Sequence, residues 1–352
     1  MIARVFRYSF AQARTRALRG KLLNAEDWHF LLNMRRLDDL LKYLSGTGYA
    51  PVVERFAGPD PLRGACRALY EELFHHAAKL MKSVPGKSAR ILADLLLRYE
   101  AENVKIILRG LWWKNDESEI LPLLYPLGAL SRVPVHALLR AGQVTTALDL
   151  LQSTPFHASL AQSHAQFEVQ GRLFPLEIAI DHAAFNHMQA DLSALKGLDR
   201  RKTRDLTGTM VDGLNLAWVA RFRHMYGLSP EETINYLLVG GRHLTLPSLG
   251  KLARAPDLPA FLAVLPVPCR EALAGVAHWG QVQSFADRWF ASELHAVFAG
   301  DPFQIGLPIS YLLLKEREVK SLECLLSAMA LGDTPEKRME PVVLPIREAV
   351  RV

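Results

Sequence analysis

The sequence predicts an all-α protein. Apolar residues recur every three to four positions over long stretches, as at Leu92, Leu96 and Tyr99, and this spacing lines one side of a helix. No stretch alternates apolar and polar residues over more than a few positions, as a half-buried strand would. One helical pattern also occurs three times, with copies roughly a hundred residues apart, which indicates a long-period repeat.

The repeated pattern is an acidic residue, a small polar residue three positions later, and then an apolar residue. Its copies lie within residues 95–113, 210–227 and 313–329. The acidic and polar positions are Glu100 and Asn103, Asp212 and Asn215, and Glu318 and Ser321. Arg109 and Arg221 follow the two asparagines by six residues, whereas the third copy has Ser327 at that place.

The asparagines fall on the apolar faces of their predicted helices, since Asn103 comes four residues after Tyr99 and three before Ile106. A buried polar group without a partner costs about 1–3 kcal/mol. We therefore interpret each asparagine as making a polar bond that fixes helix register in a bundle, with ligand binding as the alternative. Glu100 and Arg109 are separated by about two and a half turns and point to opposite sides, so we expect them to contact different neighbours.

Each copy completes a unit in which short helices precede long ones, and we expect three helical units at residues 1–115, 116–239 and 240–352. Gly20 is a C-cap and Asn24 an N-cap in the first unit, and the run from Ser229 to Glu232 starts a helix with a capping box. A tail from Gly332 onward is expected to be partly extended. The other helices are expected at residues 3–16, 37–44, 61–82, 135–139, 144–151, 175–195, 200–226, 246–254, 258–265, 281–298 and 307–331.

Charge and composition limit the classes of partner. The net charge is +6, with basic clusters at residues 4–19 and 200–204, which we interpret as solvated helix faces. A surface near anionic lipid headgroups or an acidic protein is the next alternative, and no nucleic acid is expected because no recognised module is present. Cys66, Cys269 and Cys324 are expected as reduced core residues of a cytosolic protein. No apolar run is long enough to span a membrane, and no secretion signal is recognised.

The chain shows no motif for catalysis, and we predict no catalytic residue, no cofactor and no metal site. It has no phosphate-binding loop, no Gly-x-Ser-x-Gly turn and no His-Glu-x-x-His, and His182 and His187 are five residues apart. We expect one ring of the Trp112 and Trp113 pair to pack in the core and the other against a partner or a neighbouring unit. The full set expected at a partner interface is Trp112, Trp113, Arg200, Arg201, Lys202, Arg204, Gly240, Gly241 and Arg242.

Several segments of this sequence resemble the C subunit of the bacterial and archaeal V/A-type rotary ATPases, the counterpart of the d subunit of the vacuolar ATPase. The resemblance is carried by residues 8–23, 95–110 and 306–322, by Asp212 with Asn215, and by the Gly240–Gly241 pair, in the order of the family and over almost the whole chain. Ser321 departs from the family pattern, which often has asparagine at this place.

The resemblance implies a funnel of three similar helical bundles around a pseudo-threefold axis, without an active site or a small-molecule substrate. Such a protein lies peripherally on the cytoplasmic face of the membrane rotor ring and receives the central-stalk subunits D and F. It couples the shaft to the ring during ATP-linked proton or sodium transport. The alternatives are a cytosolic α-helical scaffold that binds protein or RNA, and an enzyme with a polar pocket joining His182, His187 and an acid.

Overall fold

The computed structural model of the protein describes residues 2–54 and 61–333, and within these ranges it contains helices, turns and loops but no strand. The all-α prediction is therefore confirmed. None of these helices combines the length and the apolar character that crossing a membrane requires. Of the expected C-terminal tail, residues 334–352 lie outside the described ranges.

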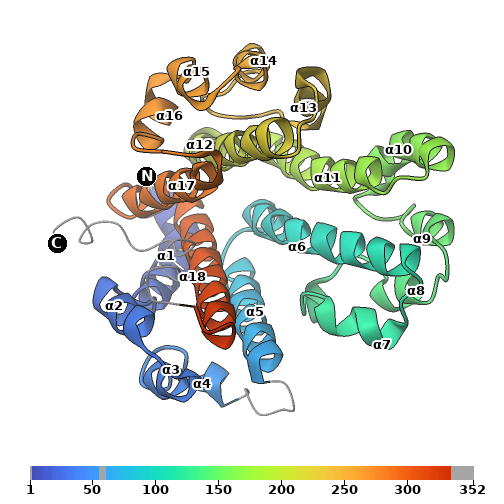
Figure 1. The fold of residues 1–352 in the computed structure, drawn as a ribbon. Helices are drawn as coiled ribbons and strands as arrows, with labels where there is room; N and C mark the ends of the chain where they lie inside the picture. Colours follow the sequence, from blue (N-terminus) through green and yellow to red (C-terminus); the bar gives the residue numbers. More distant parts are fainter. Residues whose placement is uncertain (1, 55–60, 334–352) are drawn as a thin grey trace. The chain divides into compact units, whose positions relative to one another are not determined.

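The chain forms two compact units (Figure 1). The inserted unit comprises residues 74–195, and the terminal unit comprises residues 1–73 together with residues 196–352. The terminal unit thus brings together segments from both ends of the sequence. The α5 helix (Pro61–Met81) contains the first boundary between the two units.

The inserted unit is built on the long α6 helix (Gly86–Trp112), which packs against α11 (Phe174–Ser193). Leu97, Val104 and Ile107 of α6 lie in its apolar core with Phe156 and Ile180. The shorter elements of this unit are α7 (Glu117–Ile120), η1 (Leu121–Leu123), η2 (Gly128–Leu130), α8 (Val135–Leu139), α9 (Val144–Leu150) and α10 (His157–Gln170).

The terminal unit contains the other two copies of the repeated helix, α12 (Gly197–Trp218) and α18 (Gly306–Ala330). Both pack against α17 (Val282–Val297), and α18 also packs against α1 (Ile2–Arg19). The remaining elements of this unit are α2 (Ala25–Asn33), α3 (Leu37–Leu44), α4 (Ala50–Val53), η3 (Val219–Met225), α13 (Pro230–Tyr236), α14 (Leu246–Arg254), α15 (Leu258–Ala263), α16 (Val267–Ala272) and η4 (Trp279–Gln281).

Several helix ends follow directly from local sequence. The Asn24 carboxamide accepts the N–H groups of Glu26 and Asp27 and forms the capping box that starts α2. The Ser229–Glu232 pair starts α13 in the same way. Two expectations were wrong in detail. The helix expected over residues 200–226 changes to π-helical winding at Val219, and α10, on which Leu160 and Phe167 are buried, was not anticipated.

Candidate functional site

The two asparagines of the repeated pattern each bind the main chain of a non-helical segment that follows their helix. Asn103 of α6 donates to the carbonyl oxygen of Tyr125 at 3.0 Å and accepts the N–H of the same residue at 2.7 Å. Asn215 of α12 makes the same pair of bonds with Leu238, at 2.9 and 2.8 Å. The expected buried polar bond therefore exists in both copies, but its partner is a loop and not a neighbouring helix.

The acidic residues bind main-chain N–H groups that lie just ahead of a short helix. Glu100 accepts the N–H of Arg132, three residues before α8, at 2.7 Å. Asp212 accepts three consecutive N–H groups, at 2.8–3.1 Å, from the turn that precedes α14. Glu318 accepts the N–H of Leu23, two residues before α2, at 2.6 Å. We call these three arrangements the acid clamps; each fixes the start of a short helix to a long one.

The third clamp is completed by the N-terminal part of the chain. Leu23 precedes Glu318 by 295 residues in the sequence. The Tyr49 hydroxyl donates to Glu318 at 2.6 Å, and Lys315 Nζ lies 3.0 Å from the same carboxylate and 3.7 Å from the centre of the Tyr49 ring. Burial, and then the Glu318 charge, raise the pKa of Tyr49 well above its usual value. Ser321 is also buried in α18, one turn beyond Glu318.

Gly240 and Gly241 form the turn that surrounds the Asp212 carboxylate. Gly240 has φ +101°, a conformation that L side chains rarely adopt. A Cβ at Gly241 would collide with Asp212 Oδ1 and lie 2.8 Å from the carbonyl oxygen of Leu244. The glycine pair therefore has a role inside the chain, and its expected part in a partner interface stays a prediction.

Burial raises the pKa of Asp212 to about 6, although the N–H groups of His243, Leu244 and Arg242 oppose the shift. The Asp212 side chain is fully buried, and its carboxylate accepts three N–H hydrogen bonds in place of water. The position is thus a main-chain anchor whose charge titrates near neutral pH.

The arginines of the pattern do not share one environment. Arg109 binds Glu177 of α11 through Nε and Nη2, at 2.6 and 2.8 Å, so Glu100 and Arg109 do contact different neighbours. Arg221 lies exposed in η3, and its side chain makes no hydrogen bond or ion pair with residues 2–54 or 61–333.

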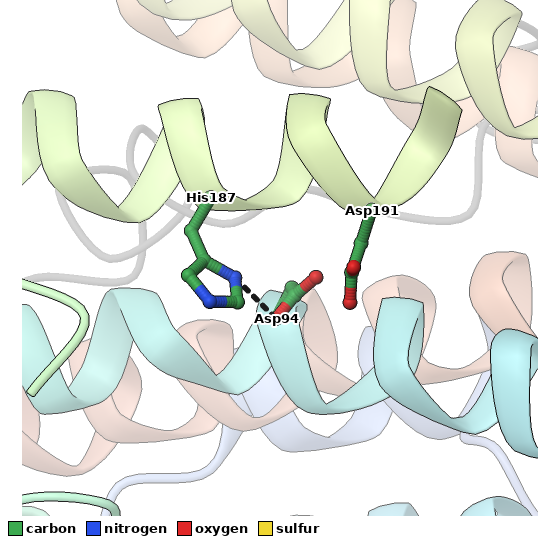
Figure 2. Close-up of side chains that lie close together, drawn as sticks. All are labelled: Asp94, His187 and Asp191. Carbon is green, nitrogen blue, oxygen red and sulfur yellow. Dashed lines mark hydrogen bonds and ion pairs between the residues drawn. The ribbon is translucent and has the colours of Figure 1, made fainter. Parts of the chain in front are cut away.

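Figure 2 shows a cluster that the sequence analysis missed, in which Asp94 of α6 faces His187 and Asp191 of α11. His187 Nδ1 lies 3.0 Å from Asp94 Oδ1, and one ligand atom from each of the three residues falls within 4.8 Å of the others. Asp94 is 93 residues from His187 in sequence, so local residue spacing does not predict the contact.

The charges around this cluster favour an ion-pair network over a metal site. Arg132 Nη1 lies 3.3 Å from Asp94, and Arg90 Nε lies 3.4 Å from Asp191, so each carboxylate already has a guanidinium partner. Burial raises the pKa of Asp94, while His187 and Arg132 act against the shift. The cluster therefore binds α6 to α11, as Lys105 does by pairing with Asp181 at 2.8 Å.

The expected interface residues differ in their surroundings. Trp112 packs edge-on against Phe167 with ring centres 5.8 Å apart, yet 41% of Trp112 and 75% of Trp113 are exposed. The expectation that one of the two rings packs in the core was therefore wrong. Arg242 pairs with Glu293 at 3.0 Å. On the first turns of α12 the exposed or partly exposed basic residues are Arg200, Arg201, Lys202 and Arg204. No partner contact tests these positions, and their role in binding stays a prediction.

Comparison with known proteins identifies the family of this chain. The model of the ATP synthase (C/AC39) subunit family matches residues 11–339. The C subunit of the A-type ATP synthase of Haloferax volcanii is 26% identical over 343 residues, covering 92% of this chain and 94% of the relative. The protein of the same description from Methanothermobacter thermautotrophicus is 23% identical over 349 residues, covering 96% and 88%. The chain belongs to the ATP synthase (C/AC39) subunit family.

Proposed function

We propose that this chain is the non-catalytic C subunit of an A/V-type rotary ATPase or ATP synthase, a socket that couples the central shaft to the membrane rotor ring. It lies peripherally on the cytoplasmic face, with central-stalk subunits D and F in its open end and the ring below. Rotation passes through it during ATP-linked proton or sodium transport. The family, and the curated relatives named as C subunits of A-type ATP synthases, support the assignment.

The acid clamps are the structural observation that carries the mechanical role. In the proposed division into residues 1–115, 116–239 and 240–352, Glu100 binds Arg132 of the second repeat, Asp212 binds residues 242–244 of the third, and Glu318 binds Leu23 of the first. Each repeat is thus attached to the next, and the third to the first. This cyclic order along the sequence is the order that three similar repeats would give, and it supports the proposed threefold repeat.

A socket that transmits rotation must resist deformation, and the clamps supply this property. Glu100, Asp212 and Glu318 are all buried, and so are Asn103 and Asn215. Opening any of these contacts would leave buried polar groups unpaired, at about 1–3 kcal/mol for each group. Torque is therefore carried through bonds that are costly to break, without any chemical step in this protein.

The assignment is tested by recovering the tagged full-length chain from solubilised membranes. We expect subunits D and F and the rotor-ring protein to be recovered with it, and we expect Trp113→Glu to reduce that recovery because the exposed ring belongs to the proposed interface. A control is Glu54→Gln, which changes an exposed residue outside the proposed interface. Recovery of the chain alone, or with RNA in a salt-sensitive manner, would contradict the stalk assignment and favour a free scaffold.

A further inference from the structure

We propose that the terminal unit binds the headgroup of an anionic phospholipid in a basic pocket between the start of α1 and the start of α12. The pocket has a volume of about 720 Å³. Its basic lining residues are Arg4, Arg7, Lys196, Arg201 and Lys202. A lipid contact deepens the proposed position at the membrane face and in that respect rests on it.

The acidic residues in the pocket are already engaged. Asp199 is buried, and its carboxylate accepts the Tyr8 hydroxyl at 2.9 Å and the N–H of Ile305 at 3.1 Å. Asp301 pairs with Arg4 at 2.9 Å and accepts the N–H of Phe303. The pocket therefore keeps a surplus of positive charge.

Four of the five cations have no acidic partner inside the part of the chain that the structure describes. No ion pair joins Arg7, Lys196, Arg201 or Lys202 to any residue of 2–54 or 61–333. Like charges gathered around one pocket repel each other, so an anion bound among them is stabilised by all four. A phosphate group is the natural occupant, because guanidinium and ammonium groups both bind phosphate oxygens.

The start of α12 adds donors to the same pocket. Gly197, Leu198 and Asp199 line it, and the N-cap residue Lys196 makes no side-chain capping bond. The first N–H groups of a helix have no partner within the helix and carry partial positive charge. They strengthen the field that the basic side chains create.

The exposed face of α1 distinguishes a lipid from free phosphate. Ile2, Phe6 and Phe10 follow one another at four-residue spacing and so lie along one side of the helix, with 74%, 83% and 60% of their surfaces exposed. Arg7 precedes Phe10 by three residues and lies at the edge of this apolar stripe. A phosphate ion has no apolar part that could pack against this stripe. A phospholipid presents an anionic headgroup beside an apolar region at the bilayer surface.

The test is co-sedimentation of the purified full-length chain with vesicles of phosphatidylcholine and phosphatidylglycerol, compared with vesicles of phosphatidylcholine alone. We expect binding to the anionic vesicles only, decreasing with salt. The double variant Arg7→Gln/Arg201→Gln is expected to weaken binding about 30-fold, because each basic side chain near an anionic surface contributes about fivefold. Both residues lack an ion pair among the described residues, so folding should be retained.

The matched control is Arg200→Gln/Arg204→Gln, which removes the same charge from exposed positions of α12 that do not line the pocket. It should weaken binding several-fold less than the pocket variant does. A second variant, Phe6→Ser, should reduce vesicle binding while leaving the affinity for inorganic phosphate unchanged.

The proposal is overturned by equal binding to both kinds of vesicle, by equal losses for the pocket variant and its control, or by binding of the chain to an acidic protein segment but not to anionic vesicles. Inorganic phosphate, at a concentration equal to that of the anionic lipid, should not release the chain from the vesicles. Complete release would also overturn the proposal, in favour of a phosphate site. Recovery of stalk subunits is measured separately, so the lipid site and the stalk assignment can fail independently.

Discussion

The side chain of Asn215 binds Leu238 in both directions, with its Nδ2 donating to the carbonyl oxygen at 2.9 Å and its Oδ1 accepting the N–H at 2.8 Å. Asn103 binds Tyr125 in the same manner. A carboxamide carries an uncharged donor and an acceptor side by side, which a carboxylate does not. This explains why an amide at this position can satisfy one loop residue completely.

Replacing Asn215 by Ala should destabilise the protein strongly. The change leaves the buried N–H and carbonyl groups of Leu238 without their partner. Each such group costs about 1–3 kcal/mol, so the free energy of unfolding should fall by about 2–6 kcal/mol. Urea denaturation measures the change. Arg204→Ala, an exposed change on the same helix, should stay within about 0.5 kcal/mol. An unfolding midpoint for Asn215→Ala like that of the control would show that the pair of hydrogen bonds to Leu238 does not contribute to stability.

Gly241→Ala should disturb the turn around Asp212. Its Cβ would collide with the Asp212 carboxylate, and we expect a loss of about 1–3 kcal/mol in the free energy of unfolding, as for other overpacked sites. Gly86→Ala is the control, because no atom lies within 4 Å of a Cβ at that position. If the two variants have the same thermal unfolding midpoint, the close approach of Asp212 to Gly241 does not affect stability.

Asp212 should make stability depend on pH in an unusual direction. Its pKa in the folded protein is about 6, above the usual value of 3.8. As pH rises from about 4 to 6 the unfolded chain loses this proton first, so the folded state binds more protons and its stability decreases. The stabilisation is fully present below pH 4, and about 3 kcal/mol of it is lost once pH exceeds 6.

The measurement for Asp212 is the difference in unfolding free energy between the wild type and Asp212→Asn across this pH range. The wild type should lose stability relative to the variant as pH rises. A difference that stays flat across this pH range would mean that burial does not raise the pKa of Asp212.

Glu318→Gln should loosen the N-terminal segment from α18. The change removes the negative charge that holds the N–H of Leu23, the Tyr49 hydroxyl and Lys315. Hydrogen exchange at the Leu23 amide should accelerate about tenfold or more, since a hydrogen bond to a charged group contributes about 1.5–3 kcal/mol. Glu323→Gln is the control on the same helix, because that carboxylate binds Tyr70 and not Leu23. Equal exchange rates in both variants would argue against the third clamp.

The sequence predicted the helices and the buried faces better than it predicted their partners. The spacing of Asn103 from Tyr99 and Ile106 determines the side of the helix on which it lies, and the structure does bury it. The partner depends on the path of a loop 22 residues further on, which no helical period encodes. For Glu318 the partner lies at the other end of the chain, so local patterns contain no information about it.

Other features gave weaker signals. The Gly240–Gly241 pair was expected at a partner interface, although two glycines about thirty residues after Asp212 also fit a turn folded closely around a side chain. The contact of Asp94 with His187 depends on the packing of α6 against α11, and each residue alone resembles an ordinary helix-surface residue.

The most direct test of the central claim compares membranes from cells with and without this chain, measuring ATP hydrolysis and ATP-driven ion transport together. If the chain couples shaft to ring, membranes without it should lose ion transport while hydrolysis continues in the catalytic part, whether attached or released, and restoring the chain should restore transport. Ion transport at the wild-type rate in its absence would contradict the account.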